Sequence, residues 1–187
     1  MKTIILASNS TARLNLLKDA GFNVIVKGLN INETSTKLKP EEIVTDLASQ
    51  KLEAYINKYG TLENKIILAA DTMIFHKNEL IGKAKNKQEA YNILKRLSND
   101  KHQIYSGYAI YLPNKGIKIG YNIIDITFKN LTDLSIMDYL FLDEWKGAAG
   151  AYRIQGIGCS LVKETKGEFS VAVGLPLNEI SALIKSS

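Results

Sequence analysis

The segment ILASNSTARLNLLKDAG, residues 4–20, places small polar residues where an apolar run gives way to a helical pattern. The hydroxyls of Ser8 and Ser10, with backbone N–H groups near the positive end of a helix dipole, suit a phosphate or another anion. Arg13, in the expected first helical turn, could add a two-pronged phosphate contact. A simpler interpretation stays open, in which Ser10 or Thr11 caps the helix and Arg13 is a solvated surface charge.

Two carboxylates are candidates for chemistry with a metal or with water. Asp71, in ILAADT, is predicted to end an apolar strand, where an unpaired carboxylate is costly and is usually held by a metal, a cation or a hydrogen bond. The alternative is an Asx-turn in which Asp71 bonds the backbone. Glu33, in the loop NINETS, is by default a solvated carboxylate, but beside Asp71 it could help to bind a hard cation such as Mg²⁺.

Three further side chains could contact a nucleotide. Lys51 and Lys83 could each reach a polyphosphate, although most lysines in a chain with 24 basic residues are solvated. Gln155 lies in the glycine-rich stretch GAAGAYRIQGIG and offers a donor and an acceptor to a base edge, unless the stretch is a plain surface loop. Cys159, in GIGCSLV, is predicted to be a buried strand thiol rather than a nucleophile.

Composition excludes several classes of protein. The chain has 187 residues, 45% of them hydrophobic and 23% charged, which is typical of an ordinary globular protein. No apolar window is long enough to span a membrane, so we expect a cytoplasmic protein with no membrane partner. The net charge of +5 is spread over interspersed residues, which argues against a nucleic-acid surface. A P-loop, a nucleophile elbow and zinc-ligand spacing are all absent from the sequence.

Apolar periodicity predicts an α/β fold with a mixed sheet and flanking helices. Strands and helices alternate first, and hairpins then dominate the middle of the chain, which is typical of such sheets. We find no linker or clean domain boundary and predict one domain over 1–187. The expected strands are 3–7, 22–26, 65–71, 73–82 as a hairpin turning at Lys77-Asn78, 102–112, 118–128, and two strands joined at Lys166-Gly167; the expected helices are 10–20, one from Pro40, 86–98, one from Thr132 or Asp133 to 142, and one from Pro176.

Seven segments in order along the chain resemble the signature segments of the Maf family of nucleoside triphosphate pyrophosphatases. They are ILASNSTARLNLLKDAG, LASQKLEA, ILAADT, IGKAKNKQEAYNILKRLS, HQIYSGYAI, KGAAGAYRIQGIG and VAVGLPL. The resemblance implies a fold akin to the inosine triphosphate pyrophosphatases, with two lobes around a cleft, and a homodimer. It also implies cleavage of a nucleoside triphosphate between its α and β phosphates, with a divalent cation such as Mg²⁺ or Mn²⁺.

The same resemblance implies roles for particular residues. Asp71 matches the family's general base and Glu33 its carboxylate near the metal. The cations that match those facing the phosphates are Arg13, Lys51 and Lys83. Ser8 and Ser10 match the hydroxyl residues of the opening loop, so this junction would hold part of the triphosphate.

Two residues match one substrate-specific branch of the family, and two others differ from the family's usual sequence. Thr72 and Gln155 match the branch acting on dTTP and UTP, since a glutamate at the glutamine's position marks the branch for methylated guanosine triphosphate. Ala12 stands where the family usually has its first arginine, and losing one charge-assisted contact costs about 1.5–3 kcal/mol if nothing compensates. Asn32 stands where an acidic residue often precedes the glutamate.

Three functions therefore follow as hypotheses. The first is a metal-dependent pyrophosphatase for dTTP, UTP and modified pyrimidine triphosphates. A second keeps the chemistry but acts on noncanonical purine triphosphates. The third is a nucleotide-binding regulator of cell division with little turnover, which the loss of the arginine at Ala12 makes conceivable.

Overall fold

A mixed β-sheet runs through the chain, as the sequence predicts. The computed structural model describes residues 2–61, 65–113 and 115–187. Within them β1 pairs in parallel with β2 and β3, while β4 on β3 and β7 on β6 are antiparallel. The strand order is β2-β1-β3-β5-β6-β7, with β4 beside β3. The strands are β1 (Thr3–Leu6), β2 (Asn23–Val26), β3 (Ile66–His76), β4 (Glu79–Ile81), β5 (Lys101–Leu112), β6 (Gly116–Phe128) and β7 (Val162–Lys166).

The helices begin and end where the sequence carries the expected signals. α2 begins at Pro40, whose fixed φ suits a first helical residue, and Gly60 follows its last turn with φ +72°. Thr132 caps α4 by accepting a hydrogen bond from the backbone of Ser135. The helices are α1 (Thr11–Asp19), α2 (Pro40–Tyr59), α3 (Lys87–Leu97), α4 (Asp133–Phe141), the 3₁₀ helix η1 (Ile157–Leu161), α5 (Phe169–Val173) and α6 (Leu177–Lys185). None of these helices has the length and apolar character that crossing a membrane requires.

The chain divides into two compact units that are not continuous in sequence. Unit 1 comprises residues 1–72, 105–122 and 170–187, and unit 2 comprises 73–104 and 123–169. The strands β3, β5 and β6 each contribute residues to both units. Because the chain passes between the units along strands and not through a linker, the sequence carries no boundary signal between them.

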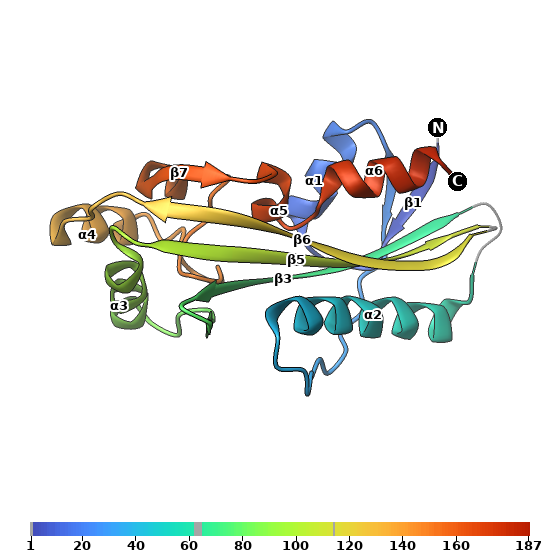
Figure 1. Ribbon diagram of the computed structural model, residues 1–187, viewed down its shortest axis with the longest axis horizontal. Coiled ribbons are helices and arrows are strands. Elements are labelled where there is room, and N and C mark those ends of the chain that lie inside the picture. Colours follow the sequence, from blue (N-terminus) through green and yellow to red (C-terminus); the bar gives the residue numbers. More distant parts are fainter. Residues whose placement is uncertain (1, 62–64, 114) are drawn as a thin grey trace. The chain divides into compact units, whose positions relative to one another are not determined.

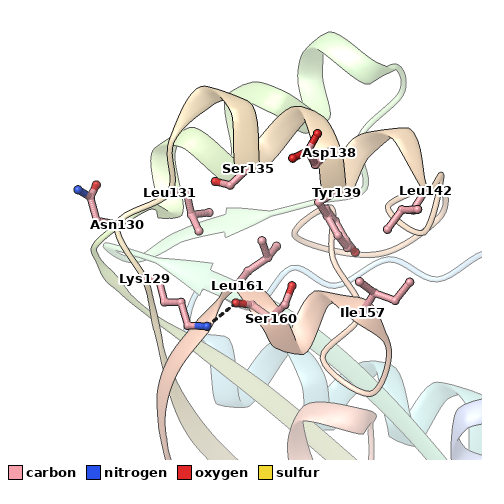
Figure 2. A pocket seen from close by; sticks show the side chains of 10 residues that line it. All are labelled: Lys129, Asn130, Leu131, Ser135, Asp138, Tyr139, Leu142, Ile157, Ser160 and Leu161. Carbon is pink, nitrogen blue, oxygen red and sulfur yellow. Dashed lines mark hydrogen bonds between the residues drawn. The ribbon is translucent and has the colours of Figure 1, made fainter.

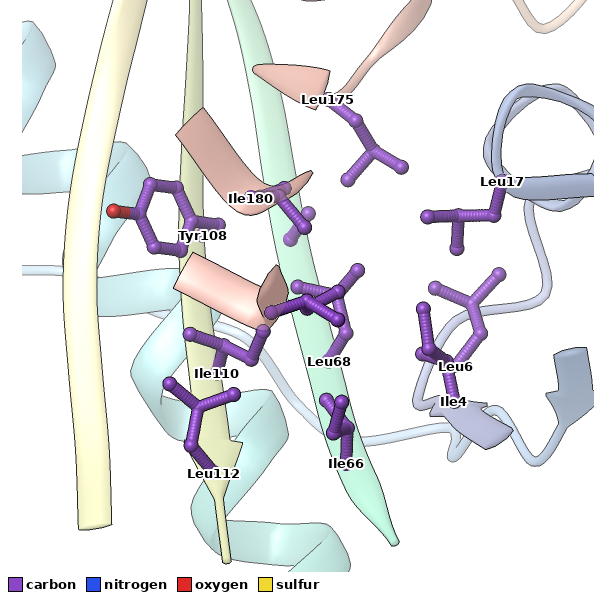
Figure 3. Close-up of a cluster of buried hydrophobic side chains, with 12 residues drawn as sticks. Ile4, Leu6, Leu17, Ile66, Leu68, Tyr108, Ile110, Leu112, Leu175 and Ile180 are labelled. Carbon is purple, nitrogen blue, oxygen red and sulfur yellow. The ribbon is translucent and has the colours of Figure 1, made fainter. Parts of the chain in front are cut away.

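The strands β1 and β3 of unit 1 are buried on both faces, which explains why their sequences are continuous apolar runs. Ile4, Leu6 and Leu68 belong to a core that includes side chains of α1 and α6 (Figures 1 and 3). Ile5 and Ile67, the alternate residues of the same strands, pack with side chains of α2. The two-residue period of a strand therefore divides one apolar run between two helical layers.

Unit 2 packs α3 against α4 and contains a turn that the sequence predicts. The β3–β4 hairpin turns at Lys77 and Asn78, both with positive φ, as a tight two-residue hairpin turn requires. His102 is buried, and its Nε2 lies 2.7 Å from the Tyr152 hydroxyl. Burial lowers the pKa of His102 to about 4, so this imidazole is neutral at physiological pH.

Three sequence-based expectations are wrong. Asp71 does not end a strand or form an Asx-turn, because β3 continues through it to His76. Cys159 is exposed in the 3₁₀ helix η1, where two glycines and the short turn replace the expected buried strand. Only the first of the two strands expected around Lys166-Gly167 forms, as β7, and the residues after the glycine form the short helix α5.

Helix α2 approaches β5 so closely that only glycine fits at Gly107. A Cβ built there would lie 2.5 Å from the backbone carbon and oxygen of Val44. We predict that Gly107→Ala lowers the free energy of unfolding by about 1–3 kcal/mol, because α2 must move away from the sheet. Chemical denaturation measures the change. The matched control is Gly82→Ala, where a Cβ meets nothing within 4 Å, and equal losses in both variants would contradict the prediction.

Candidate functional site

The junction between β1 and α1 folds around two serine hydroxyls. Ser10 caps α1, and its Oγ accepts a hydrogen bond of 3.4 Å from the backbone N–H of Arg13. The Oγ of Ser8 accepts from the Ser10 backbone N–H at 3.2 Å and from Arg13 Nη1 at 3.1 Å. The capping interpretation is therefore confirmed for Ser10. Each hydroxyl proton remains available to a ligand, because both serines act only as acceptors in these bonds.

Arg13 is a buried charge that holds three segments of unit 1 together. Its side chain donates through Nε to the Gly174 carbonyl at 3.0 Å and through Nη2 to Thr72 Oγ1 at 3.1 Å, in addition to Ser8. Only 9% of its surface is exposed, so the interpretation as a solvated surface charge is wrong. Burial lowers the pKa of Arg13 and the charges of Asp71 and Glu33 oppose that shift, but a guanidinium stays protonated in proteins.

A chain of hydroxyls extends from Arg13 across unit 1. Thr72 Oγ1 lies 2.7 Å from Ser106 Oγ, which lies 2.8 Å from the carbonyl of Val171. Because arginine can only donate and a carbonyl can only accept, both hydroxyl protons point away from Arg13. Thr72 donates to Ser106, and Ser106 donates to Val171. This direction fixes the Thr72 oxygen as an acceptor for the guanidinium.

A second cluster of charged side chains in unit 1 consists of a lysine between two carboxylates. Lys51 Nζ lies 2.6 Å from Asp71 Oδ1 and 2.8 Å from Glu33 Oε2, and it also donates to the Ala70 carbonyl at 3.4 Å. The side chains of Lys51 and Asp71 are 15% and 13% exposed, so the pair is only weakly screened by water. The sequence left open whether a metal, a cation or a hydrogen bond holds Asp71, and in the structure a cation, Lys51, contacts it.

The donor set around Lys51 fits a hard divalent cation. Asp71 and Glu33 each use one oxygen on Lys51, and among the described residues no hydrogen bond occupies the other oxygen. Two carboxylates with spare acceptor capacity are typical of a magnesium site that is completed by substrate phosphates and water. Within the same residues no group of three or more His, Cys, Asp or Glu side chains could hold a metal ion. The protein therefore supplies two ligands of such a site at most from this cluster.

Lys83 and Gln155 belong to unit 2, whereas the residues described above belong to unit 1. Lys83 is exposed and forms an isolated antiparallel bridge with Ala149, and the backbone N–H of Gly150 donates to the Gly82 carbonyl. Gln155 is exposed on a turn just before η1. The glycine-rich stretch is thus tied to the residues beside Lys83 and is not a plain surface loop.

Two residues of the Arg13 network were missed by sequence reasoning. Ser106 is fully buried in the middle of β5, and a buried serine inside a strand is a usable signal for a buried hydrogen bond. Gly174 has φ +126°, and a Cβ there would lie 3.1 Å from Arg13 Nε. No sequence signal indicates that its carbonyl binds Arg13, because the two residues are 161 positions apart.

The chain is therefore an α/β protein in which one compact unit contains a helix N-terminus, a buried arginine and two carboxylates that contact the same lysine. The model of the Maf family, described as Maf-like protein, matches residues 3–187. The chain belongs to this family.

Known proteins resemble the chain over nearly its whole length. A dTTP/UTP pyrophosphatase of Fusobacterium nucleatum is 40% identical over 94% of this chain and 90% of its own. A dTTP/UTP pyrophosphatase of Pyrococcus furiosus is 38% identical over 99% of this chain and 95% of its own. Among solved structures, a HAM1 protein from Coxiella burnetii superposes with a TM-score of 0.47 at 14% identity, covering 70% of this chain and 75% of that one.

The hydroxyl chain predicts a measurable cost for removing Ser106. Ser106→Ala leaves the Val171 carbonyl without this donor and Thr72 without its 2.7 Å acceptor, in a buried setting. We expect the free energy of unfolding to fall by about 1–3 kcal/mol, measured by chemical denaturation. Ser49→Ala is the control, because the one hydrogen bond of the Ser49 hydroxyl to the residues described is to the Thr45 carbonyl within α2, and its loss should cost little. Equal behaviour of the two variants would contradict the oriented chain.

Proposed function

We propose that this protein hydrolyses dTTP and UTP to the nucleoside monophosphate and pyrophosphate. The observation that carries the proposal is the similarity to enzymes named dTTP/UTP pyrophosphatase over at least nine tenths of both chains. The cluster of Glu33, Lys51 and Asp71 supports it, because the reaction needs a positioned carboxylate and cations in one place. The whole of 1–187 acts as one domain in this proposal.

Asp71 is the proposed general base, which orients the water that attacks the α-phosphorus. Its Oδ1 is held by Lys51, which fixes the orientation of the carboxylate, while Oδ2 is left to accept a proton. Lys51 itself is a proposed phosphate-facing cation, which exchanges part of its contact with Glu33 for a phosphate oxygen. Lys83 is proposed as a further cation toward the phosphates.

The junction of β1 and α1 is the proposed binding site for part of the triphosphate. Ser8 and Ser10 have hydroxyl protons to donate, and the first N–H groups of α1 carry the positive end of its dipole. Among the described residues, Arg13 uses three of its five N–H groups, which leaves two for a ligand. Thr72 and Gln155 are the proposed determinants of the pyrimidine base, with Gln155 offering its amide to the base edge.

A divalent cation, Mg²⁺ or Mn²⁺, is part of the proposal, held by Asp71 and Glu33. The charge balance of unit 1 supports it: Arg13 and Lys51 carry two positive charges and the two carboxylates two negative ones. The cluster is therefore neutral before a triphosphate adds several negative charges. A bound cation would neutralise the phosphates and polarise the bond that breaks. We further propose a cytoplasmic homodimer.

Replacing Asp71 tests the catalytic assignment. Asp71→Asn keeps the size of the side chain but removes the base, and we expect pyrophosphate release from dTTP and UTP to fall at least a hundredfold. The assay measures pyrophosphate from dTTP, UTP, CTP, ITP and methylated GTP with Mg²⁺ and with Mn²⁺. Asp46→Asn is the control, since within the described part of the chain Asp46 accepts one hydrogen bond, from Gln50 on α2.

The same panel separates the competing functions. A preference for ITP over UTP would favour the purine hypothesis. Binding of UTP without turnover by the wild type would favour the low-turnover regulator. Retained activity in Asp71→Asn would contradict the role of Asp71 as base.

Restoring the family arginine tests the departure at Ala12. Ala12 is partly exposed in the first turn of α1, so Ala12→Arg adds a cation near the proposed phosphate-binding site without filling the core. We expect kcat/KM for dTTP and UTP to rise roughly ten- to hundredfold, the value of one charge-assisted contact. Ala12→Gln, which adds length without charge, should leave kcat/KM near the wild-type value. An unchanged Ala12→Arg variant would mean that the existing cations already suffice.

A further inference from the structure

Gln155, the proposed contact to the base, lies in a β-turn of unit 2. The backbone N–H of Gly156 donates to the carbonyl of Arg153 at 3.1 Å, which closes a four-residue turn with Gln155 as its third residue. Tyr152 and Ile154 are both buried, whereas Gln155 is exposed. The backbone that carries Gln155 is therefore fixed on its N-terminal side by apolar packing.

A single carboxylate fixes the backbone on the other side of Gln155. Glu144 Oε1 accepts a hydrogen bond of 2.9 Å from the backbone N–H of Ile157, and its Oε2 accepts one of 2.8 Å from that of Gly158. Hydrogen bonds to an ionised acceptor are roughly twice as strong as neutral ones. A Cβ built at Gly156 would overlap with Glu144 Oε1, so the turn can close over the carboxylate only because a glycine follows Gln155.

Tyr139 links this carboxylate to the first residue of the turn. Its side chain points from α4 toward η1 (Figure 2), and its hydroxyl donates to Glu144 Oε2 at 3.0 Å and accepts from the backbone N–H of Arg153 at 3.3 Å. Burial and the contact with Glu144 raise the pKa of the Tyr139 hydroxyl, which therefore stays protonated and remains a donor. Glu144 thus contacts, directly or through Tyr139, backbone N–H groups on both sides of Gln155.

We propose that Glu144 is a positioning residue, which holds this turn so that the Gln155 amide meets the edge of the pyrimidine base. The inference rests on the proposed function, in which Gln155 contacts the base. The stretch 147–158 contains four glycines, and a flexible stretch of this kind would have to be ordered each time a substrate binds, at a cost in affinity. Because Glu144 orders the backbone beforehand, that cost falls on folding and not on binding.

The contacts of Glu144 also predict which kinetic parameter depends on it. Among the described residues, its carboxylate accepts hydrogen bonds from two backbone N–H groups and one tyrosine hydroxyl, all of them in unit 2. Asp71, the proposed base, belongs to unit 1. A contact to the nucleobase is made equally in the ground state and in the transition state, and losing such a contact raises KM while kcat stays unchanged. The effect of Glu144 should therefore be on KM.

The test is Glu144→Gln, which keeps the size of the side chain but removes the charge and turns one of its two acceptors into a donor. We expect KM for UTP to rise about tenfold while kcat stays within about threefold, measured by pyrophosphate release. In a Gln155→Ala background the same substitution should change KM less than about twofold, because the residue that it positions has been truncated. Asp143→Asn is the matched control, since the Asp143 carboxylate pairs at the surface with Lys146 Nζ, and its KM should stay at the wild-type value.

Tyr139→Phe tests the same link in case thermal unfolding shows Glu144→Gln to be misfolded. It keeps the buried ring and removes the hydroxyl between Glu144 and Arg153, and it should raise KM for UTP about threefold. Calorimetry with a methylene analogue of UTP, which cannot be cleaved between its α and β phosphates, measures binding without turnover. The affinity for this analogue should fall in the same variants and by similar factors.

Each outcome decides the inference. An unchanged KM and analogue affinity in Glu144→Gln and Tyr139→Phe would overturn it. An equal loss of kcat, or an undiminished effect of Glu144→Gln in the Gln155→Ala background, would also overturn it, because the carboxylate would then act on the fold and not through Gln155.

The binding measurement separates this inference from the proposed reaction. A wild type that binds the analogue but does not turn over UTP would contradict the reaction alone, and the affinities of the variants would still decide the role of Glu144. A wild type that does not bind the analogue would overturn both.

Discussion

The burial of Arg13 is the constraint on which the architecture of unit 1 depends. An ionised group inside a protein is costly unless its donors are satisfied, and Arg13 cannot escape the cost by losing its proton. Its three hydrogen bonds reach the β1–α1 junction, β3 and the turn before α6. Segments far apart in sequence must therefore hold their positions together, because moving any one of them would expose an unpaired donor. The absence of a side chain at Gly174 and the direction of the hydroxyl chain follow from this requirement.

The carboxylates complete the same constraint at longer range. Among the described residues, Asp71 and Glu33 form no hydrogen bond with Arg13, yet their charges stabilise its protonated form against burial. Lys51 in turn stabilises the two carboxylates by direct contact. The four charges therefore stabilise one another as a network and not as one isolated ion pair. A polyphosphate that binds to this network would meet hydrogen-bond donors that are already in place. Preorganised donors of this kind lower the cost of reorganisation during a reaction.

Much of the fold was open to prediction from local signals. Pro40 marks the start of α2, Thr132 caps α4, and Lys77-Asn78 turn the β3–β4 hairpin, because each of these residues acts through its own backbone or its near neighbours. The candidate site residues of the segment 4–20 could also be identified from the sequence, because the N-terminus of a helix has a local sequence signature.

What could not be predicted depends on contacts between distant residues. The carboxylate of Asp71 suggested the end of a strand because a charge inside one is costly, and the cost is removed by Lys51, twenty positions earlier. The partners of Ser106 could not be predicted, because Thr72 and Val171 come from other parts of the chain. Cys159 was misplaced because two glycines allowed a 3₁₀ turn that apolar periodicity does not distinguish from a short strand.

The position of Asp71 within β3, and not after it, has a chemical consequence. A carboxylate on a loop can change its orientation when a ligand arrives, whereas one on a paired strand is fixed by the backbone on both sides. Thr72, the next residue, points to the opposite face and accepts a hydrogen bond from Arg13, so consecutive residues of one strand contact Lys51 and Arg13. Any shift of β3 in register would move both groups at once and exchange their faces. The register of β3 with β1, set by the apolar pairs Ile4–Ile66 and Leu6–Leu68, therefore also sets the alignment of the carboxylate and the guanidinium.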